Sequence, residues 1–175
     1  TRGLQPANLL MNCSHTHSGP EIRTTDSALR GLEPEHREQA IAYVTSLQKR
    51  ILSSIDAAFV KLAPARISFQ KARAGFAMNR RLHSEQGYRN SPNPDGRVDH
   101  DVPLLRVEDA TGAIKAIVFG YACHNTTLSF YQMNGDYAGY AQQYLEEAHP
   151  GIVAMFMMGC GGDQNPYPRR KLELA

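Results

Sequence analysis

The sequence contains no tryptophan, and cysteine occurs only three times among its 175 residues. Three cysteines cannot all pair within one chain, so the pattern predicts free thiols or at most one bridge. This excludes the disulfide-rich scaffolds that small secreted domains use in place of a large hydrophobic core. The fold must therefore be held together mainly by non-covalent packing.

The sequence also lacks an excess of charge and long hydrophobic runs. Lysine and arginine total 19 against 17 aspartates and glutamates, which leaves a net charge of +2. Such an even balance gives no electrostatic reason to expect nucleic acid as the main partner. Apolar runs such as residues 151–158 are far too short to cross a bilayer, so we expect no transmembrane segment.

What is present is the composition of a folded domain. Hydrophobic residues make up 42% of the chain and charged residues 21%, which excludes wholesale disorder. The chain starts at Thr1 without an initiator methionine or a leader pattern, and it stops at Ala175, just after its densest polar motif. We therefore expect residues 1–175 to be part of one domain that is truncated at both ends.

Apolar periodicity predicts an alternation of strands and helices. The longest element is a helix over residues 35–62, where apolar side chains recur every three or four positions until Pro64 ends the pattern. A second helix is expected over residues 135–148, and residues 79–100 are expected to form a long loop. Helices interleaved with apolar strands predict an α/β layered domain with a mixed, largely parallel sheet flanked by helices. Strands are expected over residues 9–13, 65–76, 102–107, 114–123 and 152–158, the third and fourth of them joined as a hairpin.

Polar clusters follow three of the predicted strands, directly after each strand ends. Residues 14–20 read Ser-His-Thr-His-Ser-Gly-Pro, residues 124–127 read His-Asn-Thr-Thr, and residues 162–166 read Gly-Asp-Gln-Asn-Pro. In open α/β sheets, ligands bind at the carboxyl ends of the strands. We therefore expect these three loops to converge, although they are far apart in the sequence.

The histidines of these clusters are the natural candidates for a metal site. His15 and His17 are two positions apart, so on an extended backbone they would project to the same side, about 6–7 Å from each other. Both could then address one point, or one could bind a metal while the other handles a proton. A catalytic zinc site takes neutral imidazoles and needs about three protein ligands and a water. Our first choice of zinc ligands is His15 and His124, with His17 beside them.

Each of these motifs also has an interpretation without any chemistry. A single His-x-His pair is a weak signal, and a histidine at a strand end, such as His124, is more often a hydrogen-bonded structural residue than a ligand. Cys13, Cys123 and Cys160 each end a predicted strand, and thiolates bind zinc well. Small buried cysteines are common at such positions, however, and no Cys-x-x-Cys spacing is present. The shared placement of the polar clusters is what indicates a site.

Two arginines, Arg80 and Arg81, follow Asn79 after the second predicted strand. A guanidinium at that place could clamp a carboxylate or an oxyanion, because its donors match both in a fork. We expect this role for Arg80 and a solvated position for Arg81.

Over residues 8–168 these motifs resemble, in order, those of the neutral/alkaline non-lysosomal ceramidases. Residues 14–20 look like that family's Thr-His-Thr-His-Ser-Gly-Pro signature. Six pieces in the right order are much more specific than any one of them. The other five are Asn79-Arg80, the stretch from Val98-Asp99 through residues 104–106 to 109–112, His124-Asn125-Thr126, residues 135–140 and residues 162–166.

The resemblance implies a zinc-dependent amidase that cleaves the N-acyl bond of ceramide, a lipid amide, and a secreted or membrane-associated location. His15 and His124 match the family's two histidine zinc ligands, and His17 matches the second histidine of the signature. Arg80 matches an active-site arginine. The family's other ligands, a glutamate and a tyrosine, match nothing in residues 1–175. The remainder of a longer polypeptide is therefore expected to complete the site.

Two positions depart from the family's motifs. Asn165 stands where the Gly-Asp-x-Ser-Pro motif has serine, and Asn125 stands where the His-Pro-Thr motif has proline. An amide side chain can donate a hydrogen bond to an oxyanion, but it cannot form an ester intermediate. We therefore expect attack by a metal-activated water, with His17 as the proton shuttle and Arg80 or Asn165 holding the oxyanion.

Two other functions fit parts of the same pattern. A non-catalytic binding module that kept the fold and lost the serine would also carry Asn165. A metal-dependent phosphoesterase would share the His-x-His and Gly-Asp motifs, but it would require a Gly-Asn-His-Asp or Gly-Asn-His-Glu element that the sequence lacks.

Overall fold

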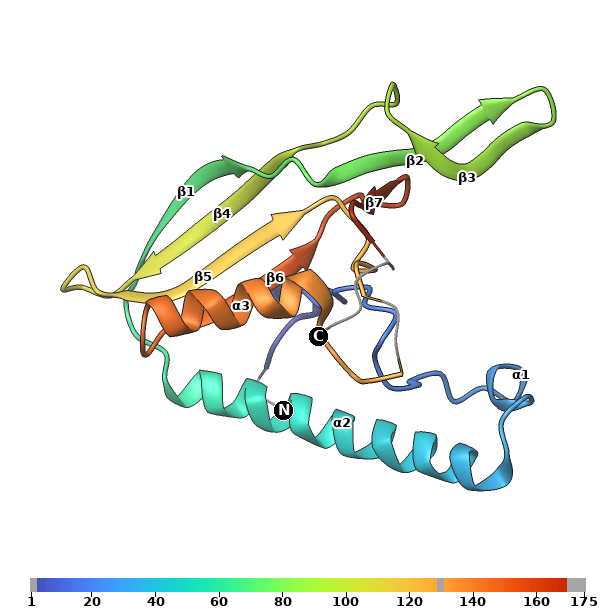
Figure 1. Ribbon diagram of the computed structural model, residues 1–175. Coiled ribbons are helices and arrows are strands. Elements are labelled where there is room, and N and C mark those ends of the chain that lie inside the picture. Colours follow the sequence, from blue (N-terminus) through green and yellow to red (C-terminus); the bar gives the residue numbers. More distant parts are fainter. Residues whose placement is uncertain (1–2, 129–130, 170–175) are drawn as a thin grey trace. The chain divides into compact units, whose positions relative to one another are not determined.

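The structure, a computed structural model, describes residues 3–128 and 131–169. The chain divides into two units, one of Thr1–Ser18 with Ala65–Ala175 and one of Gly19–Pro64 (Figure 1). The strands and the candidate site lie in the first unit. Among the described residues, no helix is both long and apolar enough to cross a membrane.

The smaller unit consists of a short helix, α1 (Asp26–Leu29), and a long one, α2 (Pro34–Val60). Proline at the start of α2 suits the first turn, where its missing N–H would have no helical partner. The Arg37 guanidinium donates to the carbonyls of Leu32 and Arg30 at 2.9 and 3.0 Å, which fastens the incoming loop to the helix. The observed helix, Pro34–Val60, confirms the long helix that the sequence predicts over residues 35–62.

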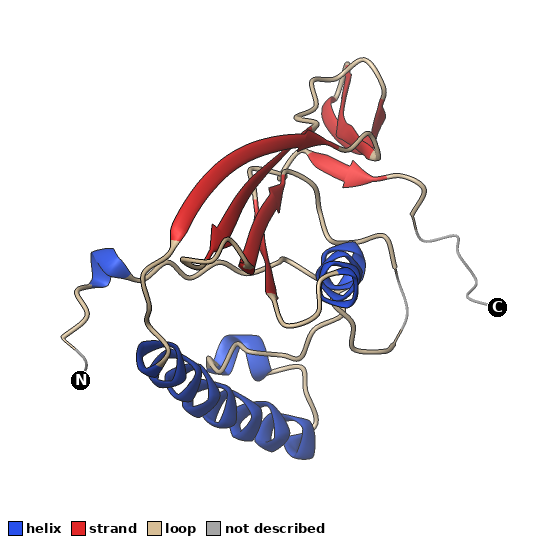
Figure 2. Ribbon diagram, turned by 90° about the vertical axis from the view of Figure 1, so that its left-hand side faces the viewer, coloured by secondary structure: helices blue, strands red, loops and turns tan. Residues whose placement is uncertain are grey.

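The larger unit contains a four-stranded sheet in the order β1-β4-β5-β6 and a three-stranded sheet in the order β3-β2-β7. Their strands are drawn in red in Figure 2. One further helix, α3 (Asp136–Ala148), connects β5 to β6. The strands of the first sheet are β1 (Arg66–Arg73), β4 (Asp101–Glu108), β5 (Ile114–Tyr121) and β6 (Val153–Met158). Those of the second are β2 (Ala77–Ser84), β3 (Gly87–Asn93) and β7 (Gln164–Pro166).

The α/β class with a mixed sheet is confirmed, but the expectation of a largely parallel sheet is wrong. Only β5 and β6 pair in parallel among the described strands, and the other four pairings are antiparallel. Parallel neighbours need a long crossover, and α3 supplies one between β5 and β6. The predicted hairpin of β4 and β5 is confirmed as an antiparallel pair.

The core of the larger unit lies on one face of the four-stranded sheet. Alternate residues of β5 and β6 point to that face, among them Ile117, Phe119 and Phe156, and they form one buried cluster with Ala138 of α3. The next turns of α3 extend the contact through Leu145. Because this packing fixes the C-terminal end of β5, it also fixes the loop that begins at residue 122.

The opposite face of the same sheet carries a row of apolar side chains that remain accessible. The strand register aligns Phe69, Leu105, Val118 and Met155 across β1, β4, β5 and β6. Phe69 is 58% exposed and Met155 is 45% exposed. A cavity of about 390 Å³ lies along this face and extends to Cys160.

Two segments differ from the sequence-based expectation. Residues 9–13 contain no strand; instead, the Asn12 side chain donates to the Met158 carbonyl at 3.2 Å and accepts from the Met158 N–H at 2.8 Å. One side-chain amide thus replaces a strand partner at the edge of β6, which an apolar run alone cannot reveal. Residues 79–100 are not one loop, because β2 and β3 form a hairpin within them.

Candidate metal centre

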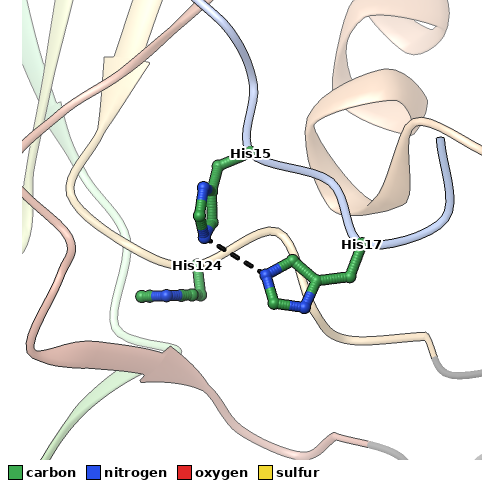
Figure 3. Close-up of side chains that lie close together, drawn as sticks. All are labelled: His15, His17 and His124. Carbon is green, nitrogen blue, oxygen red and sulfur yellow. Dashed lines mark hydrogen bonds between the residues drawn. The ribbon is translucent and has the colours of Figure 1, made fainter. Parts of the chain in front are cut away.

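Three histidines from two distant segments lie next to one another in the larger unit (Figure 3). His15 and His17 come from the N-terminal segment, and His124 comes from the loop after β5. One ring nitrogen of each lies within 4.8 Å of those of the other two. The rings of His15 and His124 have centroids 4.7 Å apart. The structure thus brings together the three histidines that the sequence singles out.

His124 is held in one orientation by backbone carbonyls. Its Nδ1 lies 2.7 Å from the Gly161 carbonyl and 3.0 Å from the Gln164 carbonyl. Because both partners accept only, Nδ1 must carry the proton, and this leaves the lone pair of Nε2 free. Burial lowers the pKa of His124, so the ring is neutral near pH 7. A neutral imidazole whose other nitrogen is anchored is the usual form of a histidine metal ligand.

The separation between the two N-terminal histidines also suits a metal. The Nε2 atoms of His15 and His17 are 3.1 Å apart. At this distance one ring can donate a hydrogen bond to the other, and the same separation would also suit two ligands of one ion. His15 has a φ of 60°, a left-handed conformation that non-glycine residues adopt mainly where the surroundings impose it. The three imidazoles therefore form a cluster that could hold a metal ion.

The carbonyl that anchors His124 depends on a glycine. A Cβ atom built at Gly161 would lie 2.5 Å from the backbone nitrogen of Cys123 and 2.7 Å from the carbonyl carbon of Ala122. Neither atom can move without displacing the end of β5. The close approach of residues 161 and 123, which positions the Gly161 carbonyl below the imidazole, therefore requires glycine.

Arg80 and Asn165 form a second pair of candidate groups. β7 pairs antiparallel with β2, which aligns Met78 with Asn165 and brings Arg80 beside the end of β7. The Arg80 guanidinium donates through Nε to the Gly162 carbonyl at 3.1 Å and through Nη1 to Asn165 Oδ1 at 3.4 Å. Burial lowers the pKa of Arg80, and the neighbouring charges of Arg81 and Arg169 add to this effect. Because other positive charges lie near the Arg80 guanidinium, binding of an anion there would be favourable.

Comparison with known proteins identifies the family. A family profile described as neutral/alkaline non-lysosomal ceramidase, N-terminal, matches residues 4–167. The chain belongs to this family. It is 30% identical to neutral ceramidase A and 29% identical to neutral ceramidase B, both of Dictyostelium discoideum. Each alignment covers 93% of this chain and 24% of the relative, so the chain spans about a quarter of the length of the curated relatives that it matches.

Solved ceramidase structures share the fold of this family member. A ceramidase complexed with C2 matches with a TM-score of 0.66 over 89% of this chain and 25% of its own, at 22% sequence identity. The crystal structure of neutral ceramidase from Pseudomonas aeruginosa matches with a TM-score of 0.67 over 94% of this chain and 26% of its own, also at 22% identity. These matches support the ceramidase fold, including its mixture of helices and sheets.

Among the described residues, the cluster of possible metal ligands in this ceramidase-family chain contains histidines and no cysteine. All three cysteines are free thiols, which is one of the two arrangements that the sequence predicts. Cys123 is fully buried, and burial raises the pKa of its thiol to about 12. A thiol that stays protonated at neutral pH is neither a good nucleophile nor a ready metal ligand. Arg81 is exposed, as expected, although its guanidinium also donates to the Gly162 carbonyl at 3.1 Å.

Sequence reasoning missed the importance of Asp136, the first residue of α3. Its carboxylate is almost fully buried and accepts from the backbone N–H groups of Thr127 at 3.1 Å, Leu128 at 2.9 Å and Tyr137 at 2.8 Å. The first two groups belong to the loop that carries His124. The available signal was the Gly-Asp pair before a helical pattern, which is typical of a helix start but does not reveal the loop that the carboxylate holds.

We predict that Asp136→Asn lowers the free energy of unfolding by about 2–4 kcal/mol, because the variant loses charge-assisted acceptors and turns an amide NH₂ toward backbone donors. Urea unfolding measures the change. Glu147→Gln is the matched control, since Glu147 is an exposed acid of the same helix that accepts only from Gln143 at 2.7 Å. Equal stability of the two variants would contradict a supporting role for Asp136.

Proposed function

We propose that this chain carries the histidine ligands of a zinc-dependent amidase, which hydrolyses the N-acyl amide bond of a ceramide-like lipid. The observation that carries the proposal is the convergence of three imidazoles from segments more than a hundred residues apart, with their nitrogens within 4.8 Å. Membership of the ceramidase family supports the lipid amide as substrate class. In this proposal His15 and His124 bind the metal, and His17 moves the proton.

The roles of the residues follow from their positions. A bound zinc ion would polarise the scissile carbonyl and lower the pKa of a water molecule. His17, which is exposed and beside His15, accepts the proton of the attacking water and returns it to the leaving amine. Arg80 donates to the oxygen on which negative charge develops, and Asn165 holds the Arg80 guanidinium in place.

The remaining parts of the site are proposed to come from a longer polypeptide. Three histidines offer ligands here, and the family's glutamate and tyrosine ligands have no counterpart in this sequence. The chain spans about a quarter of its curated relatives, so there is ample length for further ligands in a protein of that size. The same additional chain would cover the exposed apolar row of the four-stranded sheet.

Metal content and amide hydrolysis together test the proposal. The full protein, purified without chelators, is expected to contain close to one zinc per chain and to release fatty acid from an N-acylsphingosine. Removal of the metal with a chelator should abolish the release, and added zinc should restore it. A protein that binds no divalent metal under these conditions would leave the hydrolase proposal without a basis.

A second candidate is a binding module without catalysis, and the burial of Asn165 favours it. Asn165 is 1% exposed, replaces the family's serine and is hydrogen-bonded by Arg80. We predict that Asn165→Ser leaves the unfolding temperature within a few degrees and raises N-acyl hydrolysis if the serine is needed, because the hydroxyl fits the same space. Lipid amide binding with no hydrolysis in either form would support the binding module and contradict the amidase.

A further inference from the structure

Asn125, the residue after His124, has a buried side chain that joins two segments of the candidate site. It is 0% exposed. Its Nδ2 donates to the backbone carbonyl of Ser14, which is 111 positions away in the sequence. Its Oδ1 accepts from the backbone N–H of Ala138, in the first turn of α3, at 3.3 Å. One amide group therefore connects the segment before His15, the loop of His124 and the start of α3.

We propose that Asn125 is a positioning residue that holds His15 against His124 at the separation a metal ion needs. The proposal rests on the metal site of the proposed function and identifies the group that keeps its two halves together. The Ser14 carbonyl belongs to the same rigid peptide unit as the nitrogen of His15. Fixing that carbonyl fixes the position of the His15 Cα, and the φ of 60° at His15 then sets the direction in which its side chain leaves the backbone.

The chemistry of the contact restricts which side chain can make it. Both a donor and an acceptor are needed, because the Ser14 carbonyl accepts and the Ala138 N–H donates. Asparagine offers both on one short, planar group, whereas aspartate offers only acceptors at neutral pH. Proline, which the family's motif has at this position, offers neither from its side chain. In this chain the link between Ser14 and Ala138 therefore depends on asparagine at position 125.

The N-terminal segment has other anchors on both sides of His15. Before it, the Asn12 side chain bonds to the Met158 backbone at 3.2 and 2.8 Å. Thr16 Oγ1 donates to the Asn134 carbonyl at 3.0 Å, and the Asn134 N–H donates to the Ser18 carbonyl at 3.0 Å. These bonds hold the His17 side of the loop. Asn125 acts on the preceding side, so the two sets of contacts bracket His15. Holding a ligand in place before the metal arrives reduces the entropy lost on binding.

Metal affinity tests the proposal in the full protein. Asn125→Asp removes the donor and keeps the shape, and Asn125→Ala removes the whole tie. Both variants are expected to weaken zinc affinity about 10- to 100-fold in a chelator competition, because this is the usual effect of losing a group that orients a metal ligand. Both are also expected to alter the visible spectrum of the cobalt-substituted protein. Gln142→Ala is the matched control, because it loses an amide bond to the Ala154 carbonyl far from the histidines. Affinity within about twofold of the parent protein in both Asn125 variants would overturn the proposal.

A metal-free measurement separates this proposal from the proposed function. The rings of His15 and His124 are close enough to give nuclear Overhauser effects in the parent protein. These effects are expected to disappear in Asn125→Ala and to persist in Gln142→Ala. If the parent protein binds no zinc, the hydrolase proposal fails, and the ring contacts still decide the role of Asn125. Ring contacts that persist in Asn125→Ala would contradict it.

Discussion

His124→Ala is expected to abolish metal binding and amide hydrolysis together. The imidazole is buried and pre-oriented by two carbonyls, so alanine removes one of the three ring nitrogens that lie together at this point. Loss of the metal should lower kcat/KM by about 10³- to 10⁴-fold, because carbonyl polarisation and water activation disappear at once. Metal analysis of the purified variant and hydrolysis of an N-acylsphingosine measure the two effects.

The other histidines make this prediction specific. His15→Ala should behave like His124→Ala, whereas His17→Ala should keep the metal and lose about 10²- to 10⁴-fold in kcat, as expected for a proton carrier. His36→Ala is the control, since His36 is an exposed histidine of α2, outside the cluster. A His17→Ala protein that loses the metal as completely as His124→Ala would show that His17 is a ligand, and the proton role would then be wrong.

Arg80→Ala is expected to lower kcat by about 10²- to 10³-fold with little change in the metal content. Its guanidinium donates to Asn165 Oδ1 at 3.4 Å. Stabilising the charge that develops on the substrate oxygen is worth this much in other acyl-transfer enzymes. Arg80→Lys should recover only part of the rate, because a lysine keeps the charge but loses the fork that contacts Gly162 and Asn165 together.

A neighbouring arginine provides the comparison. Arg81→Ala removes a guanidinium that bonds to the same Gly162 carbonyl from an exposed position. Its effect on kcat is expected to be less than about tenfold, because exposed charges are screened by solvent. Similar losses in the two variants would indicate that general positive charge, and not the position of Arg80, is what matters.

Periodicity in the sequence predicts the elements whose packing is regular. The apolar residues of α2 recur at helical spacing, β6 is a continuous apolar run, and β5 is apolar apart from Lys115 and Gly120. The structure agrees with the expectation for these elements. The β2–β3 hairpin carries asparagine, arginine, serine and proline in place of an alternating apolar pattern. β7 is three residues long. Both are stabilised by pairing with a neighbour, and pairing leaves little trace in a local pattern.

The groups of the candidate site also fall into those that the sequence reveals and those that it does not. The sequence shows which side chains follow each predicted strand, and this is enough to group His15, His17 and His124. The carbonyls of Gly161 and Gln164 that orient His124 could not be found, because every residue has a carbonyl and only the fold decides where it points. The tie from Asn125 to Ser14 was hidden for a related reason, since its partner is backbone.

The histidine cluster joins the start of the chain to a loop more than a hundred residues later, and an ion seated there would act as a removable cross-link. Closing a loop of that length restricts the unfolded chain, and a ligand that binds only the folded form raises stability by RT ln(1 + [L]/Kd). Metal supply would then govern the lifetime of the protein as well as its activity. Without the ion, the segment of His15 and His17 would lose this link to the loop of His124 and would become more accessible to proteases.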